Sequence, residues 1–262
     1  MLKEYQGALE DLDKAHVLKP NHAWTLRNRA TVKIILKEYQ GALEDLGKAD
    51  VLEPNNALTL RNRGDVKYRL KEYQGALEDL DKADVLEPNN ALTLRNRGDV
   101  KRMLKEYQGA LEDLDKADVL EPNNAFTLRT RGDVKYMLKE YQGALKDLDK
   151  ADVLKPNNAL TLRNRGDVKY MLKEYQGALK DLDKADVLEP NNALTLRNRA
   201  NVKMMLKEYQ GALEDLDKAD VLEPNNALTL RNRANAKMML KKSIKEPWRT
   251  LTRLMFSNRT MH

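Results

Sequence analysis

One sequence unit of 34 residues recurs through most of this chain and constrains its fold more than any other feature. The segment at 55–88, NNALTLRNRGDVKYRLKEYQGALEDLDKADVLEP, returns almost letter for letter. The period is marked by prolines at Pro20, Pro54, Pro88, Pro122, Pro156, Pro190 and Pro224. A fixed period of about 20 to 50 residues is typical of a solenoid, in which each unit buries its apolar face against its neighbours. We therefore expect one elongated array.

Each unit predicts two helices. The first, helix A, is expected over about 57–70, and Asn55 and Asn56 before it can cap its amino terminus. The second, helix B, is expected over 73–86 and ends before Pro88, because a residue that precedes proline avoids the helical region. Its apolar residues recur at the three- and four-residue steps of one helix face: Tyr73, Ala76, Leu77, Leu80 and Ala83. The two-residue break between the helices predicts an antiparallel hairpin.

The predicted array begins and ends with half units. Residues 1–20 carry a helix B, residues 21–224 carry six A–B pairs, and residues 225–240 carry a final helix A. Residues 241–262 do not follow the repeat, and Pro247 can occupy the first turn of a short helix there. One face of that helix would carry Trp248, Leu251, Leu254 and Met255. We expect this tail to cap the last open face; the alternative is a basic amphipathic segment for an acidic partner or a membrane surface.

The composition argues against catalysis and against cofactors. The chain has no cysteine, only three histidines, and no catalytic triad, zinc motif or glycine-rich phosphate loop. Its net charge of +6 is concentrated in residues 241–262, which alone carry +5. Neither a signal peptide nor an apolar run of about 20 residues is present, so we expect a cytoplasmic protein. We expect no enzyme activity, no metal, and neither nucleic acid nor a membrane as the main partner.

The residues at fixed places in each pair resemble those of the tetratricopeptide repeat. The resemblance covers residues 1–240 and rests on the 34-residue step together with six positions: Gly64, Tyr73, Ala76, Leu80, Ala83 and Pro88. Pentatricopeptide repeats are similar but step by 35 residues. The resemblance implies an all-α fold, a right-handed superhelical solenoid of antiparallel helix pairs. It also implies a protein-interaction scaffold whose concave groove is lined by helix A.

Three charged positions depart from this pattern. Arg63 and Lys67 lie on the packing face of helix A, where the family usually has apolar residues. We expect their apolar stems to be buried while Asp84 accepts their charged heads in a polar ladder between helices. The equivalents of Asp84 are Asp118, Asp152 and Asp186. Asp79 and Asp81, by contrast, are expected on a solvated face.

A glycine recurs near the start of every helix B. Gly75 and its equivalents each cost about 1 kcal/mol relative to alanine inside a helix. We interpret this position as a repeated local weakness.

The predicted groove comes from the face of helix A opposite its packing face. In the unit at 55–88 this face carries Leu58, Arg61, Asp65, Tyr68 and Arg69. The same positions in other units are Leu92, Arg95, Asp99, Phe126, Arg129, Asp133, Tyr136, Leu160, Arg163, Asp167, Tyr170 and Arg197. Arg61 and Asp65 are four residues apart, so they can also pair within the helix. Tyrosine and methionine at the next positions offer adaptable apolar surface for varied peptides.

One subsite matches a more specific family feature. Some tetratricopeptide proteins bind the C-terminal carboxylate of a partner with a basic residue and two asparagines from adjacent helices A. Arg197, Asn201 and Asn232 occupy those three places. Two further basic residues of that clamp are missing here. A carboxylate clamp for acidic C-terminal peptides is therefore a minor hypothesis.

The sequence leaves three functions open. The leading one is a scaffold that binds a protein or peptide segment in the groove. The second is self-assembly end to end, because the first helix B exposes Ala8, Leu9, Leu12 and Ala15 without a preceding helix A. The third is nucleic-acid binding through the basic tail, which predicts a steep dependence on salt.

Overall fold

The computed structural model describes the backbone of residues 2–257 and the side chains of residues 3–245. Every regular element in that part of the chain is an α-helix. The chain divides into two compact units, residues 1–139 and residues 140–262. Each is a stack of antiparallel helix pairs. The predicted all-α repeat fold is therefore confirmed.

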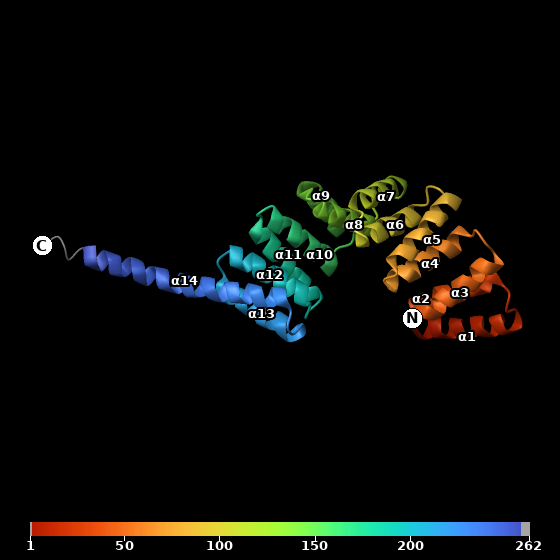
Figure 1. Cartoon of the computed structure of the whole chain (residues 1–262), viewed down its shortest axis with the longest axis horizontal. Helices are drawn as coiled ribbons and strands as arrows, with labels where there is room; N and C mark the ends of the chain where they lie inside the picture. Colours follow the sequence, from red (N-terminus) through yellow and green to blue (C-terminus); the bar gives the residue numbers. More distant parts are fainter. Residues whose placement is uncertain (1, 258–262) are drawn as a thin grey trace. The chain divides into compact units, whose positions relative to one another are not determined.

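The first unit contains eight helices, each packed against the next along the chain (Figure 1). Their bounds are α1 Leu2–Leu18, α2 Ala23–Ile35, α3 Tyr39–Leu52, α4 Ala57–Arg69, α5 Tyr73–Leu86, α6 Ala91–Met103, α7 Tyr107–Leu120 and α8 Ala125–Met137. The even-numbered helices are helices A, and each also touches the next helix A. This second set of contacts places the helices A side by side along one surface.

The second unit repeats the arrangement in its described part. Its helices are α9 Tyr141–Leu154, α10 Ala159–Met171, α11 Tyr175–Leu188, α12 Ala193–Met205, α13 Tyr209–Leu222 and α14 Ala227–Ser257. Helices α10, α12 and α14 are the helices A of this unit, and they again touch one another in succession. None of the helices among the described residues has the length and hydropathy needed to cross a membrane.

Local signals set the ends of the helices. The Asn56 side chain accepts a hydrogen bond from the Thr59 backbone N–H at 3.0 Å and caps α4. Asn55 has a different role, because its φ of 61° places it in the left-handed region that lets the chain turn into the helix. At the A–B turn Lys71 is also left-handed, with φ 66°. Both asparagines were expected as caps, but only Asn56 caps the helix, whereas Asn55 makes the turn before it.

The core lies between each helix A and the helices B on either side of it. Ala76 and Leu80 of α5 are fully buried, and Val100 of the next helix A packs against them. On the other side, a Cβ added to Gly64 of α4 would lie 2.9 Å from Leu80 Cγ. The two helices therefore approach closely at Gly64, as the resemblance implied.

The C-terminal region differs from its prediction. A final helix A ending at 240 and a separate short helix were expected, but α14 is continuous to Ser257 and extends past α13 (Figure 1). In the complete pairs a left-handed lysine such as Lys207 makes the turn between the two helices. Lys241 stands at that position in α14 and is helical, so the turn does not form. The proposed capping face at 248–255 lies outside the residues whose side chains are described.

Candidate peptide-binding groove

A buried ionic cluster fixes helix A against helix B in five of the described pairs. Arg63 donates from Nε and Nη2 to the two carboxylate oxygens of Asp79, at 2.8 and 2.6 Å. Lys67 Nζ lies 2.8 Å from the same carboxylate. The arrangement recurs as Arg29–Asp45–Lys33, Arg97–Asp113–Lys101, Arg165–Asp181–Lys169 and Arg199–Asp215–Lys203. Two positive charges and one carboxylate thus satisfy each other away from water.

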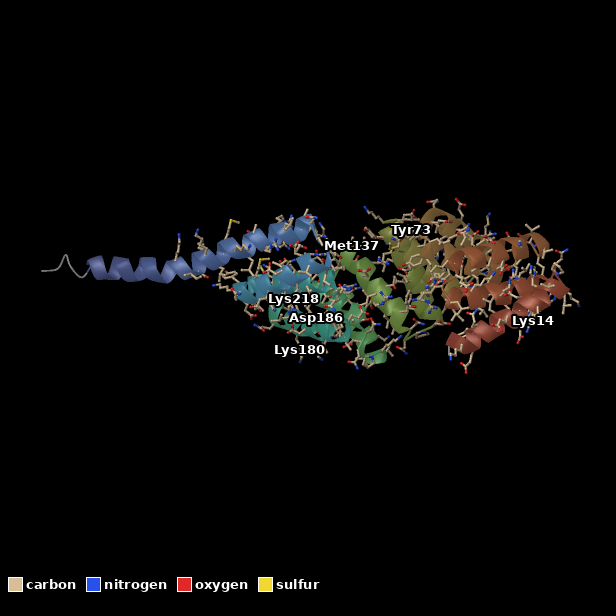
Figure 2. The ribbon with its side chains drawn as sticks, turned by 90° about the horizontal axis from the view of Figure 1, so that it is seen from below. Lys14, Tyr73, Met137, Lys180, Asp186 and Lys218 are labelled. Carbon is tan, nitrogen blue, oxygen red and sulfur yellow. The ribbon has the colours of Figure 1, made fainter. Side chains whose placement is uncertain are left out.

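The prediction for these charges was partly wrong. Asp79 was expected on a solvated face, yet it is only 2% exposed. Asp84, expected to accept the heads of Arg63 and Lys67, instead accepts from Nη1 of Arg97 in the next pair at 2.9 Å. Asp186, which is labelled in Figure 2, makes the same contact to Arg199 at 2.9 Å. The ladder between helices exists, but the carboxylate that holds both cations belongs to Asp79 and its equivalents.

The recurrent glycine of helix B has a packing role. Gly75 faces the stem of Lys67, and a Cβ there would lie 3.3 Å from Lys67 Cδ. The Lys67 ammonium also lies 3.4 Å from the Gly75 carbonyl oxygen. The interpretation as a local weakness was therefore incomplete: the missing side chain gives the lysine its path to Asp79.

The ion pairs of the predicted groove residues differ from those expected. Asp65 accepts from Arg69 Nε at 3.0 Å rather than from Arg61. Arg61 instead points towards Glu87 at the end of helix B, 3.9 Å away. Arg27 and Arg197 make the corresponding contact at 2.6 Å, to Glu53 and Glu223.

A cavity of about 440 Å³ opens between helices α4, α6 and α8 of the first unit. Five predicted groove residues line it together: Arg61, Asp65, Leu92, Arg95 and Phe126. Arg69, which the sequence also placed on the groove face, lines it too, but three further lining residues were not predicted: Asn62, Asn96 and Asn124. Asn62 and Asn96 are one period apart and occupy the same position of helix A, so the repeat itself was the signal that could have found these two.

The arginines of this cavity are incompletely compensated. Arg61 Nε and Nη1 are buried and have no hydrogen-bond partner. Burial lowers the pKa of the Arg95 guanidinium, and Glu121, 4.0 Å away, offsets only part of that effect. Arg95 and Arg129 both lie over the ring of Phe126, at 5.5 and 4.8 Å from its centroid. The site therefore combines cationic donors with an aromatic surface.

A polar cluster closes the adjoining part of the same surface. Arg102 donates from Nε to Asp99 at 2.9 Å and from Nη1 to Asp133 of α8 at 3.0 Å. Burial raises the pKa of the Tyr68 hydroxyl to about 12, and the nearby Asp99 carboxylate adds to the shift. Tyr68, Asp99 and Asp133 were predicted as groove residues. The ion pair of Arg102 with Asp133 joins α6 to α8.

The second unit has a cavity of different character. It measures about 390 Å³, and three of its lining residues were predicted: Tyr170, Asn201 and Asn232. The others are Met204, Met205, Tyr209, Arg231, Asn235 and Met239. Methionine side chains are flexible and polarizable, so this surface can adapt to different apolar groups.

The residues of the hypothetical carboxylate clamp have partners within the chain. Arg197 Nη1 lies 2.6 Å from Glu223, and Asn232 Nδ2 donates to Asn201 Oδ1 at 2.8 Å. Asn198 makes the same type of contact to Asp167 at 2.6 Å. A bound carboxylate would have to displace these contacts. No group of three or more metal-ligating side chains occurs among the described residues.

The remaining predicted residues follow the same helical positions. Leu58 is 43% exposed at the start of α4. Tyr136 on α8, and Leu160 and Arg163 on α10, are half-buried. They line neither of the two cavities described above.

Comparisons with known proteins identify the fold. No family model and no curated protein matches the sequence. Among solved structures, a chain of the APC/C hetero-tetramer Cut9–Hcn1 matches with TM-score 0.82 and 19% identity over 90% of this chain. This chain spans 46% of that one. A tetratricopeptide repeat protein from Parabacteroides merdae matches with TM-score 0.68 and 20% identity, over 90% of this chain and 93% of that one.

A third structure is YrrB, described as a TPR protein with an unusual peptide-binding site. It matches with TM-score 0.58 and 23% identity, over 73% of this chain and 99% of that one. At these identities the likeness concerns the fold. This chain has the tetratricopeptide-repeat fold, and the resemblance drawn from its residues is confirmed.

Proposed function

We propose that this chain is a non-enzymatic protein-interaction scaffold that binds an extended or helical segment of a partner in the groove lined by helices A. The observation that carries the proposal is the Arg61 guanidinium beside an open cavity. Its Nε and Nη1 are buried and make no hydrogen bond among the described residues, and Glu87, 3.9 Å from Nη1, lies beyond hydrogen-bond distance. An unpartnered buried donor is costly, and a carbonyl or carboxylate oxygen of a bound segment would satisfy it. YrrB, a neighbour in fold, is itself described as having a peptide-binding site.

Apolar groups beside the arginines support a peptide as the ligand. Leu92 is 36% exposed and Phe126 is 40% exposed, although both are large hydrophobic residues. They lie in the same cavity as Arg61 and Arg95. Such a surface offers donors for backbone carbonyls and an aromatic face for a side chain. In the second unit Met205 and Met239 would provide the corresponding apolar contact.

The test is selection from a displayed library of random peptides, followed by titration of the selected peptides in solution. Phe126→Ala is expected to weaken a selected peptide by about tenfold or more, as aromatic interface anchors commonly do. The matched control is Val119→Ala on helix B, a residue that is 79% exposed and outside the cavity. It is expected to leave the affinity unchanged.

A second variant tests the cation. Arg61→Ala should weaken binding, whereas Lys116→Ala on the exposed face of α7 should not. Selected peptides that bind the Phe126 and Arg61 variants as tightly as the original chain would contradict the proposal. A chain that selects no peptide from a diverse library would also contradict it.

A further inference from the structure

The last helix A of the chain has an unpartnered face. Leu230 of α14 is 40% exposed, whereas Leu196 at the same position of α12 is 3% exposed. Ala234 is likewise exposed, while its equivalent Ala200 is fully buried. In α12 these positions pack against helix B of the same pair. The exposed residues of α14 are therefore the side that a helix B covers elsewhere in the chain.

Helix α1 exposes the complementary face. Asp11 is 81% exposed, and among the described residues its ion pair is with the neighbouring Lys14, 3.4 Å away. Lys14 is labelled in Figure 2. The equivalent of Asp11 in α13, Asp215, is 2% exposed. No atom approaches within 4 Å of a Cβ built on Gly7, although the equivalent Gly211 faces the stem of Lys203. Among the described residues α1 has only α2 as a neighbour, so the side that meets a helix A in the other pairs is open.

The two open faces match a pair that is formed within the chain. Residues 227–240 differ from residues 193–206 of the α12 region only in having Ala236 for Val202. Residues 2–18 differ from residues 206–222 of the α13 region only in having His16 for Asp220. Neither difference lies on an open face: Ala236 packs towards α13, and Asp220 contacts Arg233 of the following helix A.

The charges on the two faces are also complementary. Arg233 of α14 reaches Asp217 and Asp220 of α13 through Nη1. In α12 the equivalent Arg199 uses Nη1 in the same way, and its Nε and Nη2 hold Asp215 at 2.9 and 2.6 Å. Lys203 adds a contact of 2.8 Å to that carboxylate. Asp11 on α1 is the carboxylate that would complete the same cluster with Arg233 and Lys237.

We propose that α1 of a second copy of this chain packs on the open face of α14, so that the two helices form an A–B pair equivalent to α12–α13. The contact is heterologous, because a different face is used on each copy. Its apolar part would bury Leu230 and Ala234 against Ala8 and Leu12. In α12–α13 a turn of the chain links the two helices, but here they belong to different copies. The association therefore depends on concentration.

Two blocked variants test the geometry. Ala8→Glu blocks the face of α1, because its equivalent Ala212 is fully buried. Ala234→Glu blocks the face of α14. Both residues are exposed in the single chain, so neither change disturbs its core. Each variant alone is expected to stay monomeric in sedimentation velocity, and an equal mixture is expected to form a one-to-one dimer.

Matched controls carry the same charge at neighbouring positions that remain exposed in complete pairs. Gln6→Glu and Met239→Glu meet this condition, because Gln210 and Met205 are exposed in α13 and α12. Both controls should associate like the original chain. Asp11→Asn should weaken association by about tenfold or more, since it leaves the two cations uncompensated. Glu10→Gln, the neutralisation control on α1, should not.

Three results would overturn the inference. The first is a monomer whose sedimentation does not change from low micromolar to near-millimolar concentration. The second is a mixture of the blocked variants that fails to dimerise. The third is a chain truncated after Lys245 that associates when the full chain does not, which would make the chain's own C-terminal segment the occupant of α14.

Discussion

Arg63 and Asp79 form a two-pronged ion pair across the interface between α4 and α5, with nitrogen–oxygen distances of 2.8 and 2.6 Å. Asp79 is 2% exposed and also holds Lys67. In each of the five clusters described above, one aspartate holds both an arginine and a lysine. The packing of the repeat is therefore ionic at a position where such folds can be apolar, and its stability depends on that carboxylate.

Replacing the shared carboxylate should be strongly destabilising. Asp79→Asn removes the carboxylate that holds Lys67 and leaves Arg63 with Asp50 alone, and we expect a loss of about 3–5 kcal/mol in the free energy of unfolding. Asp81→Asn on the same helix is the control: Asp81 is 53% exposed and contacts Arg97 at 3.2 Å. Its loss should cost less than about 1 kcal/mol. Urea denaturation followed by circular dichroism compares the two, and equal effects would contradict the assignment.

Acid should weaken the array through the same carboxylates. Burial alone would raise the pKa of Asp79, but hydrogen bonds from Arg63 and Lys67 outweigh it and hold the pKa below its usual range. Asp45 and Asp181 behave in the same way. A lowered folded-state pKa contributes stability that is present above the unfolded pKa of 3.8 and is lost as pH falls through the folded value. Stability should therefore be nearly constant near neutrality and fall below about pH 4. Unfolding that began well above pH 5 would implicate other groups.

His16 gives the first helix a separate sensitivity to pH. It stands where other helices B carry an aspartate that pairs with the next arginine, as Asp50 does with Arg63 at 2.8 Å. Burial and then the Arg29 charge lower the pKa of His16. A lowered histidine pKa means that stability is full above pH 6.5 and declines as pH falls through the folded value.

His16→Asp should remove this decline and restore the ion pair with Arg29. The gain at neutral pH is expected to be below about 1 kcal/mol. Hydrogen exchange of α1 and α2 at pH 7 and at pH 5 measures it locally. His22→Gln is the control, because it removes a histidine outside this pair without adding the capping carboxylate that aspartate would bring to the start of α2. A chain with His16→Asp that kept the original pH dependence would refute the role given to His16.

The left-handed lysine in each A–B turn offers a stabilising change. Lys105 has φ 65°, a conformation that costs a residue with a Cβ about 1–2 kcal/mol. Glycine adopts it freely, so Lys105→Gly should raise the free energy of unfolding by up to about 1 kcal/mol once the extra freedom of the unfolded chain is subtracted. Lys105→Ala keeps the Cβ and should bring no gain. Thermal melts of the two variants separate backbone strain from the loss of the lysine charge.

Much of the fold could be predicted because its signals are local. Pro88 and the capping asparagine before α4 act within one turn of the chain, and the apolar stripe of Tyr73 and Leu80 repeats at the helical period. The predicted helix at 73–86 coincides with α5, Tyr73–Leu86. The same logic failed at α14, because whether a turn forms after residue 240 depends on one left-handed residue that composition does not reveal.

The candidate site could be predicted only as a surface. Helical spacing placed Arg61, Leu92 and Phe126 on one face, and the structure joins them in one cavity. Helical spacing could not show that Arg61 points to Glu87 rather than to Asp65. That contact links residues 26 positions apart, as the Arg27–Glu53 bond does.

By itself the sequence determined the repeat length, the helix pairs and the tetratricopeptide-repeat fold, since each follows from periodicity and short-range conformational preference. Only the tertiary structure decided that Asp79 rather than Asp84 holds the two cations, and that Gly75 makes room for Lys67. Both aspartates are compatible with a solvent-facing or a buried position when one helix is considered alone. The choice depends on how the neighbouring helix is rotated and how closely it approaches, and packing sets both.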